Sequence, residues 1–117
     1  MITDTEFIVA ADRTLEAIGT ALDAALADSD VDLDWTCNDG ILEIESDDGG
    51  KLIVNRHTPN REIWVAARAG GYHFRAVAGA WRDTRGGDEL GAALAALLKG
   101  QMGLVVTFPV LIAPALD

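Results

Sequence analysis

The sequence is poor in the residues from which most catalytic and metal centres are built. It has one cysteine and two histidines, and neither His57 nor His73 lies in an ExxH or HExxH pattern. A ferritin-type di-iron centre needs Glu and His side chains from paired helices, and no nucleophile–base pair can be named either. We therefore predict that the protein is not an enzyme. The single Cys37 excludes an intrachain disulfide, which favours a reducing compartment, and we expect this thiol to be a small core residue.

Basic residues are also scarce. Nine Lys and Arg stand against nineteen Asp and Glu, which gives a formal net charge of −10. This balance argues against nucleic acid or an anionic membrane as a partner, and it favours cations or basic protein surfaces. The charge is unevenly placed, because residues 1–48 hold fourteen of the nineteen acids and a single base, Arg13.

Long hydrophobic runs are absent. The apolar stretch 104–116 is short and is broken by Pro109 and Pro114, so it cannot span a bilayer as a helix. The N-terminus has neither the basic region nor the purely apolar region of a signal peptide. We expect a cytoplasmic protein. Half of the 117 residues are apolar, and this composition and length suit one folded domain.

Hydrophobic periodicity predicts the order of the elements. Thr3 and Glu6 have capping-box spacing, and apolar residues at three- and four-residue steps behind them predict an amphipathic helix to about Ala27. From Val31 the period changes to two. Five to six short strands follow, separated by turn signals such as the Asn-Asp-Gly of residues 38–40.

A second helix is predicted after the strands. Asp88 and Glu89 place acids at its start, leucines at helical spacing follow, and Gly100 is the expected end. The order of helix, antiparallel strands and helix predicts an α+β fold, with both helices packed on one face of the sheet.

Carboxylates crowd the junction between the first helix and the first strand. The heptapeptide DSDVDLD places four of them in seven residues, namely Asp28, Asp30, Asp32 and Asp34. The first three match ligand positions of a calcium-binding EF-hand loop, but the required Gly is Leu33 here, so we reject that site. Asp12, Glu16 and Asp23 fall on one face of the predicted helix. Two interpretations stay open: a merely solvated face, or a surface that receives hard cations or a basic partner.

A tryptophan is predicted on the open face of the sheet. If Ile63 and Val65 of EIWVAA face the helices, Trp64 points away from them. It is either covered by neighbouring side chains or a binding anchor, since exposed tryptophans are common hot spots. Asn55 and Arg56 precede it on the neighbouring strand.

The order of these residues resembles the bacterial frataxin (CyaY) family. The similarity rests on Glu6-Phe7 and Ala11-Asp12, on DSDVDLD and GILEIE, and above all on KLIVNRHTPNREIWVAA and GGYHF followed by Trp81. It implies a two-layer α-β sandwich of five to six strands that acts in iron–sulfur cluster assembly. It also implies partners, the cysteine desulfurase and the scaffold protein, and a monomer, with iron-dependent oligomers left open.

The resemblance implies that ferrous and ferric iron bind weakly to an acidic ridge, where other divalent cations could also bind. Carried over residue by residue, the metal-binding acids are Asp4, Glu6, Asp12, Glu16, Asp23, Asp28, Asp30, Asp32 and Asp34, and the partner-binding residues are Asn55, Arg56 and Trp64. An iron-oxidising or storage protein, and a pure adaptor that binds iron incidentally, are the alternatives.

Two departures from the family pattern affect these expectations. The first is a thinner ridge, because other members carry acids where this chain has Gly19, Thr20, Ala24 and Leu26. Glu16 partly replaces them. The second is the C-terminus: we expect a frataxin-like domain over residues 1–103, followed by an apolar tail, 104–117. Its Leu104, Val106 and Phe108 are predicted to pack between the two helices and stabilise the domain.

Overall fold

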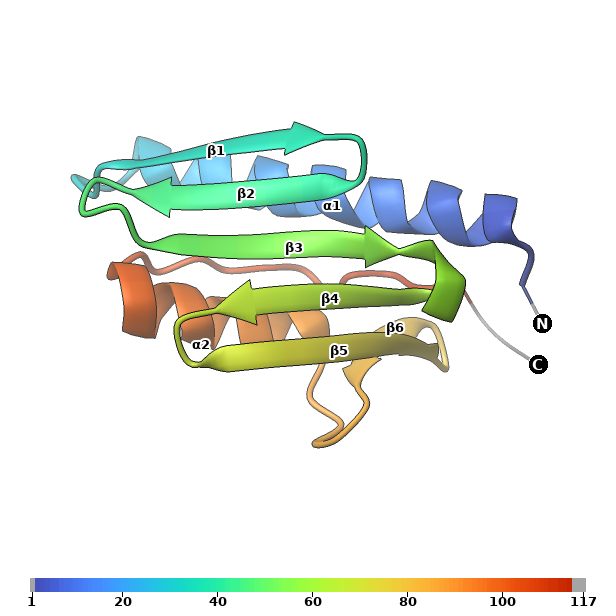
Figure 1. Ribbon diagram of the computed structural model, residues 1–117. Helices are drawn as coiled ribbons and strands as arrows, with labels where there is room; N and C mark the ends of the chain where they lie inside the picture. Colours follow the sequence, from blue (N-terminus) through green and yellow to red (C-terminus); the bar gives the residue numbers. More distant parts are fainter. Residues whose placement is uncertain (1, 115–117) are drawn as a thin grey trace.

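The computed structural model describes residues 2–114 of the chain (Figure 1). Within them, two α-helices, six β-strands and one short 3-10 helix follow one another in this order: α1 (Asp4–Ala27), β1 (Leu33–Asn38), β2 (Ile41–Ser46), β3 (Lys51–His57), η1 (Thr58–Asn60), β4 (Glu62–Ala67), β5 (Gly70–Val77), β6 (Ala80–Asp83) and α2 (Leu90–Met102). The predicted α+β order is confirmed, with six strands.

The strands form one antiparallel sheet in the order β1-β2-β3-β4-β5-β6, so each strand pairs with its neighbours in sequence. Both helices lie behind the same face of this sheet, α1 behind β1 and β2 and α2 behind β4 (Figure 1). The other face is left open. None of the helices formed by the described residues has the length and apolarity that crossing a membrane requires.

Helix α1 begins with the predicted capping box. The Thr3 hydroxyl accepts a hydrogen bond from the Glu6 backbone N–H (3.1 Å), and the Glu6 carboxylate accepts one from the Thr3 N–H (3.0 Å). The apolar stripe behind this cap is buried against the sheet and includes Phe7, Ala11, Leu15, Ile18 and Leu22. Capping and burial together explain a helix that continues to Ala27.

Strand β1 differs from its prediction in two respects. It begins at Leu33, two residues after the expected start at Val31. Cys37 was expected in the core and is exposed, so that prediction is wrong. Because β1 is an edge strand, no further strand covers the outer side of the thiol, and the charged Asp12, Glu16 and Arg56 lie near it.

Helix α2 extends beyond its predicted end. Glu89 caps its start by accepting hydrogen bonds from the Gly91 and Ala92 N–H groups (2.8 and 3.2 Å). Gly100 lies inside the helix, and Gly103 ends it with φ 69°. The prediction of Gly100 is wrong because a helix tolerates an interior glycine, whereas the left-handed residue after the last turn strongly favours one.

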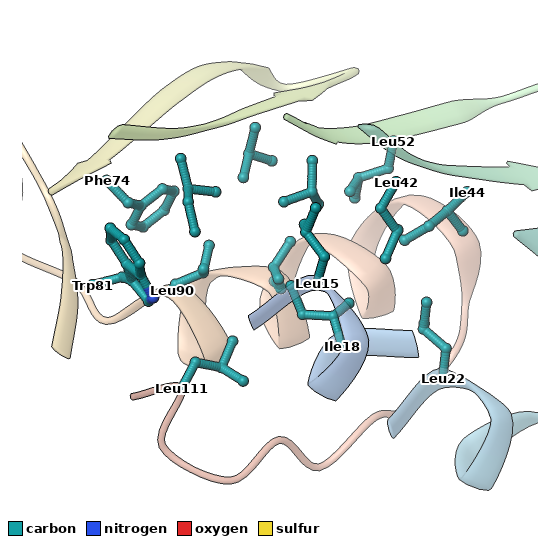
Figure 2. Packing of buried hydrophobic residues seen from close by; sticks show 14 of the residues in the cluster. Leu15, Ile18, Leu22, Leu42, Ile44, Leu52, Phe74, Trp81, Leu90 and Leu111 are labelled. Carbon is teal, nitrogen blue, oxygen red and sulfur yellow. The ribbon is translucent and has the colours of Figure 1, made fainter. Parts of the chain in front are cut away.

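The core lies between the sheet and the two helices (Figure 2). Its largest member is Trp81 on β6, which is fully buried. The Trp81 indole N–H donates to the Thr14 hydroxyl (2.9 Å), and its ring meets the edge of Phe7 with centroids 6.0 Å apart. Trp81 thus satisfies its polar atom while it fixes the short strand β6 to α1.

The chain after α2 returns through the core. Leu104, Val106, Leu111 and Ala113 are buried, and Phe108 is half-buried. Leu111 points toward Leu90 and the other core side chains in Figure 2. A β-bridge between Ala80 and Ile112 attaches this segment to the edge of β6. Leu111 and Ala113 are buried residues that the prediction did not include. That the tail stabilises the domain stays a prediction, and its last residues, 115–117, lie outside the described part of the chain.

Candidate functional site

The predicted ridge begins with acids that already have partners. Asp4 forms an ion pair with Arg61 (2.7 Å), and Asp12 forms one with Arg56. Glu6 belongs to the capping box, and hydrogen bonds from the backbone and side chain of Thr3 hold the pKa of the Glu6 carboxyl below its usual value. Part of the bonding capacity of these three carboxylates is therefore used within the fold.

Asp23 is tied to an indole ring that crosses from β1 to α1. Its carboxylate accepts a hydrogen bond from Nε1 of Trp35 (2.8 Å). The ring lies directly against Gly19, where an added Cβ would be 2.5 Å from Cη2 of Trp35. Any other residue at position 19 would displace the ring. The thinner ridge at this point thus has a steric reason, which periodicity alone does not reveal.

Five predicted ridge acids have no internal counter-charge. They are all exposed, and none takes part in an ion pair within the described part of the chain: Glu16, Asp28, Asp30, Asp32 and Asp34. Asp34 stands directly opposite Glu45 of β2, an acid that the predicted set missed. The two-residue hairpin turn fixes this register, so the sequence did contain a signal for Glu45.

These acids are spread along one edge of the molecule and do not converge on a common position where one ion could bind. Among residues 2–114, no group of three or more His, Cys, Asp and Glu side chains could hold a metal ion. A hard cation at this edge would meet few carboxylates at once and would keep much of its water. Tight sites for hard cations enclose the ion with several oxygen ligands, an arrangement that these acids do not form among the described residues.

Three stacked aromatic rings occupy the open face. Trp64 of β4 lies between His57 of β3, with centroids 3.6 Å apart, and His73 of β5, with centroids 4.3 Å apart. Its Nε1 donates to the Glu62 carboxylate (2.8 Å), which is 5% exposed. Neighbouring side chains therefore cover both faces of the indole, and only its edge is available to a partner. The sequence interpretation missed His57 and Glu62, because only the strand register brings them to Trp64.

The other two predicted partner-binding residues lie on opposite faces. Asn55 pairs directly with Trp64 across β3 and β4, on the open face. The Arg56 side chain points the other way, is 18% exposed, and is paired with Asp12 and, at 3.8 Å, with Asp39. Arg56 joins β3 to α1 and to the first hairpin, so the structure separates it from Asn55 and Trp64.

Cys37 has no activating surroundings. Partial burial, followed by the nearby Asp12 and Glu16 carboxylates, raises the pKa of the Cys37 thiol. A raised pKa keeps the sulfur in its protonated, weakly nucleophilic form at neutral pH. The exposed thiol is therefore poorly suited to nucleophilic chemistry.

A sequential antiparallel sheet, two helices on one face and an open acidic edge define a small frataxin-like sandwich. A sequence model described as "Frataxin-like domain" matches residues 1–104, and the chain belongs to the frataxin family. The iron–sulfur cluster assembly protein CyaY of Burkholderia mallei (strain SAVP1) is 43% identical over 107 residues, which cover 92% of this chain and 98% of that one. The protein of the same name from Cupriavidus metallidurans is 44% identical over 108 residues, with coverage of 91% and 96%.

Solved structures agree with this assignment. The frataxin from Psychromonas ingrahamii matches with a TM-score of 0.83 and 31% identity, over 92% of this chain and 99% of that one. Trimeric yeast frataxin, complexed with ferrous iron, matches with a TM-score of 0.69 and 25% identity, over 80% and 86% of the two chains. The predicted family and fold class are confirmed.

Proposed function

We propose that the protein binds ferrous and ferric iron weakly on its acidic ridge and regulates iron–sulfur cluster assembly by docking on the cysteine desulfurase and its scaffold protein. The observation that carries the proposal is a row of five exposed acids that form no ion pair among residues 2–114: Glu16, Asp28, Asp30, Asp32 and Asp34. Relatives more than 40% identical are named iron–sulfur cluster assembly proteins, which supports the same function.

One surface serves both roles in this proposal. A dense negative edge attracts cations and also steers the domain toward a basic patch on a protein partner. Iron bound there neutralises part of that charge and so changes the docking affinity. The protein would act in the cytoplasm, as a monomer when iron is absent, and without turnover of its own.

An iron-oxidising or storage function is the second candidate. The trimeric yeast relative in complex with ferrous iron favours it. Within residues 2–114, however, the acids do not converge in groups of three, and an oxidation centre needs iron held in a fixed ligand set. Saturable turnover of ferrous iron would support this candidate over the regulator.

The ridge can be tested by anaerobic titration with ferrous iron, followed by NMR of the labelled chain. Iron should broaden the signals of the α1 and β1 edge. Changing Asp28, Asp30, Asp32 and Asp34 together to Asn should weaken binding by about ten-fold or more, equivalent to about 1.4 kcal/mol.

A charge-matched pair of variants provides the control. Asp32→Asn with Asp34→Asn removes two ridge charges, whereas Asp83→Asn with Asp88→Asn removes two charges beside β6 that form no ion pair among residues 2–114. Only the first pair should weaken iron binding. If both pairs act equally, or if millimolar iron moves no ridge signal, the acids serve protein docking alone and the adaptor alternative is preferred.

Regulation by iron adds a second requirement. By linkage, a sensor must bind the desulfurase with different affinity when iron is present. We expect the dissociation constant for the desulfurase to change several-fold with iron for the wild type. If the dissociation constant for the desulfurase stays the same at every iron concentration, the protein is an adaptor and not an iron sensor.

A further inference from the structure

A groove lies between the first half of α1 and the tail, on the side of the molecule away from the sheet. It has a volume of about 740 Å³ and is lined by side chains of α1 between Thr5 and Ala17 and by residues 109–114 of the tail. Figure 1 shows this part of the tail running toward the end of the molecule at which α1 begins. The volume lies within the range of about 300–1,000 Å³ that is usual for small-molecule sites.

Both walls of the groove present apolar side chains to solvent. Val9 of α1 is 45% exposed, and Val110 and Ile112 of the tail are 66% and 77% exposed. Leu111 and Ala113, which alternate with them, are buried in the core and hold the tail in place. An apolar ligand in the groove would therefore remove hydrophobic surface of both walls from water without disturbing the core.

Much of the hydrogen-bonding capacity of these walls is already used. The Thr14 hydroxyl donates to a backbone carbonyl of α1 (3.0 Å) and accepts the Trp81 indole N–H (2.9 Å). The N–H groups of Leu111 and Ala113 donate to other parts of the fold, at 3.4 and 2.8 Å. A bound peptide needs partners for its own backbone, whereas an acyl chain needs none. The walls therefore suit an acyl chain better than a peptide.

The groove has one unpaired cation, Arg13. It is the single basic residue among residues 1–48, lines the groove, is exposed, and forms no ion pair within residues 2–114. Glu6, which also lines the groove, is engaged in the capping box. Arg56 and Arg61 both pair with acids of α1. The Arg13 guanidinium can therefore accept a ligand carboxylate, which it matches in charge and in planar geometry.

We propose that this groove binds a medium-chain fatty acid, whose acyl chain lies between Val9 and the exposed tail residues Val110 and Ile112 and whose carboxylate pairs with Arg13. Apolar walls with a single unpaired cation select this ligand class. A net charge of −10 opposes a second copy of the chain as the occupant. The proposal is independent of iron binding, because the acids of residues 28–34 follow the opposite end of α1.

Sodium octanoate is the probe, titrated into the isotope-labelled full chain and followed by NMR. Octanoate should shift the signals of Val9, Val110 and Ile112, with a dissociation constant of about 1 mM or below. Because the ligand binds the folded chain across two of its segments, saturating octanoate should also raise Tm by about 3 °C or more. 1-Octanol has the same chain without the charge and serves as the reference ligand.

Three variants separate the charge from the apolar contact. Arg13→Gln should weaken octanoate binding about five-fold and leave octanol binding unchanged, because only the carboxylate pairs with the guanidinium. Arg68→Gln removes an exposed arginine between β4 and β5, outside the groove, and should change neither ligand. Val9→Ser should weaken both ligands. All three positions are exposed, so the Tm of each free variant should stay within about 3 °C of the wild type.

The same assays contain the results that would overturn the proposal. It is wrong if about 5 mM octanoate shifts no groove signal, or if octylammonium binds more tightly than octanoate. Equal losses of octanoate and octanol binding in Arg13→Gln would show that the guanidinium does not select the carboxylate. If Leu116→Ser strengthens octanoate binding about ten-fold or more, residues 115–117 are the occupant. Self-association of the wild type in sedimentation, reversed by octanoate, would identify a second copy of the chain instead.

Discussion

A chain that ends at Gly103 is expected to be less stable than the full chain by about 3 kcal/mol or more. The deletion removes three buried aliphatic side chains at once, those of Leu104, Val106 and Leu111. Each contributes about 1.5–3 kcal/mol when fully buried, from which the entropy of ordering the segment is deducted. Ending at Gly103 keeps the hydrogen bond from the Gly103 N–H to the Lys99 carbonyl (3.2 Å), whereas the longer one from the Leu104 N–H to the Leu98 carbonyl (3.4 Å) is lost with the segment.

The expected fall in Tm is about 10 °C or more, measured by thermal unfolding followed by circular dichroism and checked by urea titration. The single substitution Leu111→Ala should account for a large share, because truncation of a buried Leu costs about 2–5 kcal/mol. Figure 2 shows this side chain pointing into the core beside Leu90.

The same segment supplies its own controls. Val105 and Ile112 are 72% and 77% exposed, although they are as apolar as their buried neighbours. Val105→Thr and Ile112→Ser should each change stability by less than about 0.5 kcal/mol. If the chain ending at Gly103 melts at the same temperature as the full chain, residues 1–103 form a self-sufficient domain and the tail is not a stabilising element.

The elements of this fold were predictable because their signals are local. The capping box at Thr3 and Glu6 and the stripe behind it are visible within one helix, and the turn at Asp39 and Gly40 is defined by two residues. The two predictions that were wrong, the end of α2 and the burial of Cys37, depend on backbone conformation and on surroundings that the local sequence does not define. Gly100 and Gly103 are equivalent by composition, and only Gly103 has the positive φ that ends α2. Cys37 follows an apolar alternation, but it is exposed because it lies on an edge strand.

The candidate site was predictable to a smaller extent for the same reason. Local sequence showed the acids as a group and placed Trp64 on the open face. Whether an acid is free or paired depends on residues far along the chain, as with Asp12 and Arg56, which are forty-four positions apart. The ring stack on Trp64 depends on the register of three strands, which hydrophobic alternation alone leaves undetermined.

Gly19→Ala is expected to destabilise the protein by about 1–3 kcal/mol, although the same change inside a helix usually stabilises by about 0.5–1 kcal/mol. The reason is the contact with Trp35, whose ring atoms Cη2, Cζ2 and Cζ3 would lie 2.5–3.0 Å from the new Cβ. The ring must move, and its movement strains the hydrogen bond from Nε1 to Asp23. Gly19→Glu, which would restore an acid to the ridge, should be at least as costly.

Gly100→Ala is the control, because Gly100 is also helical but, unlike the buried Gly19, is exposed and has no atom within 4 Å of an added Cβ. This variant should gain about 0.5–1 kcal/mol in urea unfolding. A double-mutant cycle isolates the contact: in a Trp35→Ala background, Gly19→Ala should become neutral or stabilising. If Gly19→Ala destabilises equally in both backgrounds, the indole is not the obstacle. The missing charge at position 19 would then need an explanation other than contact with Trp35.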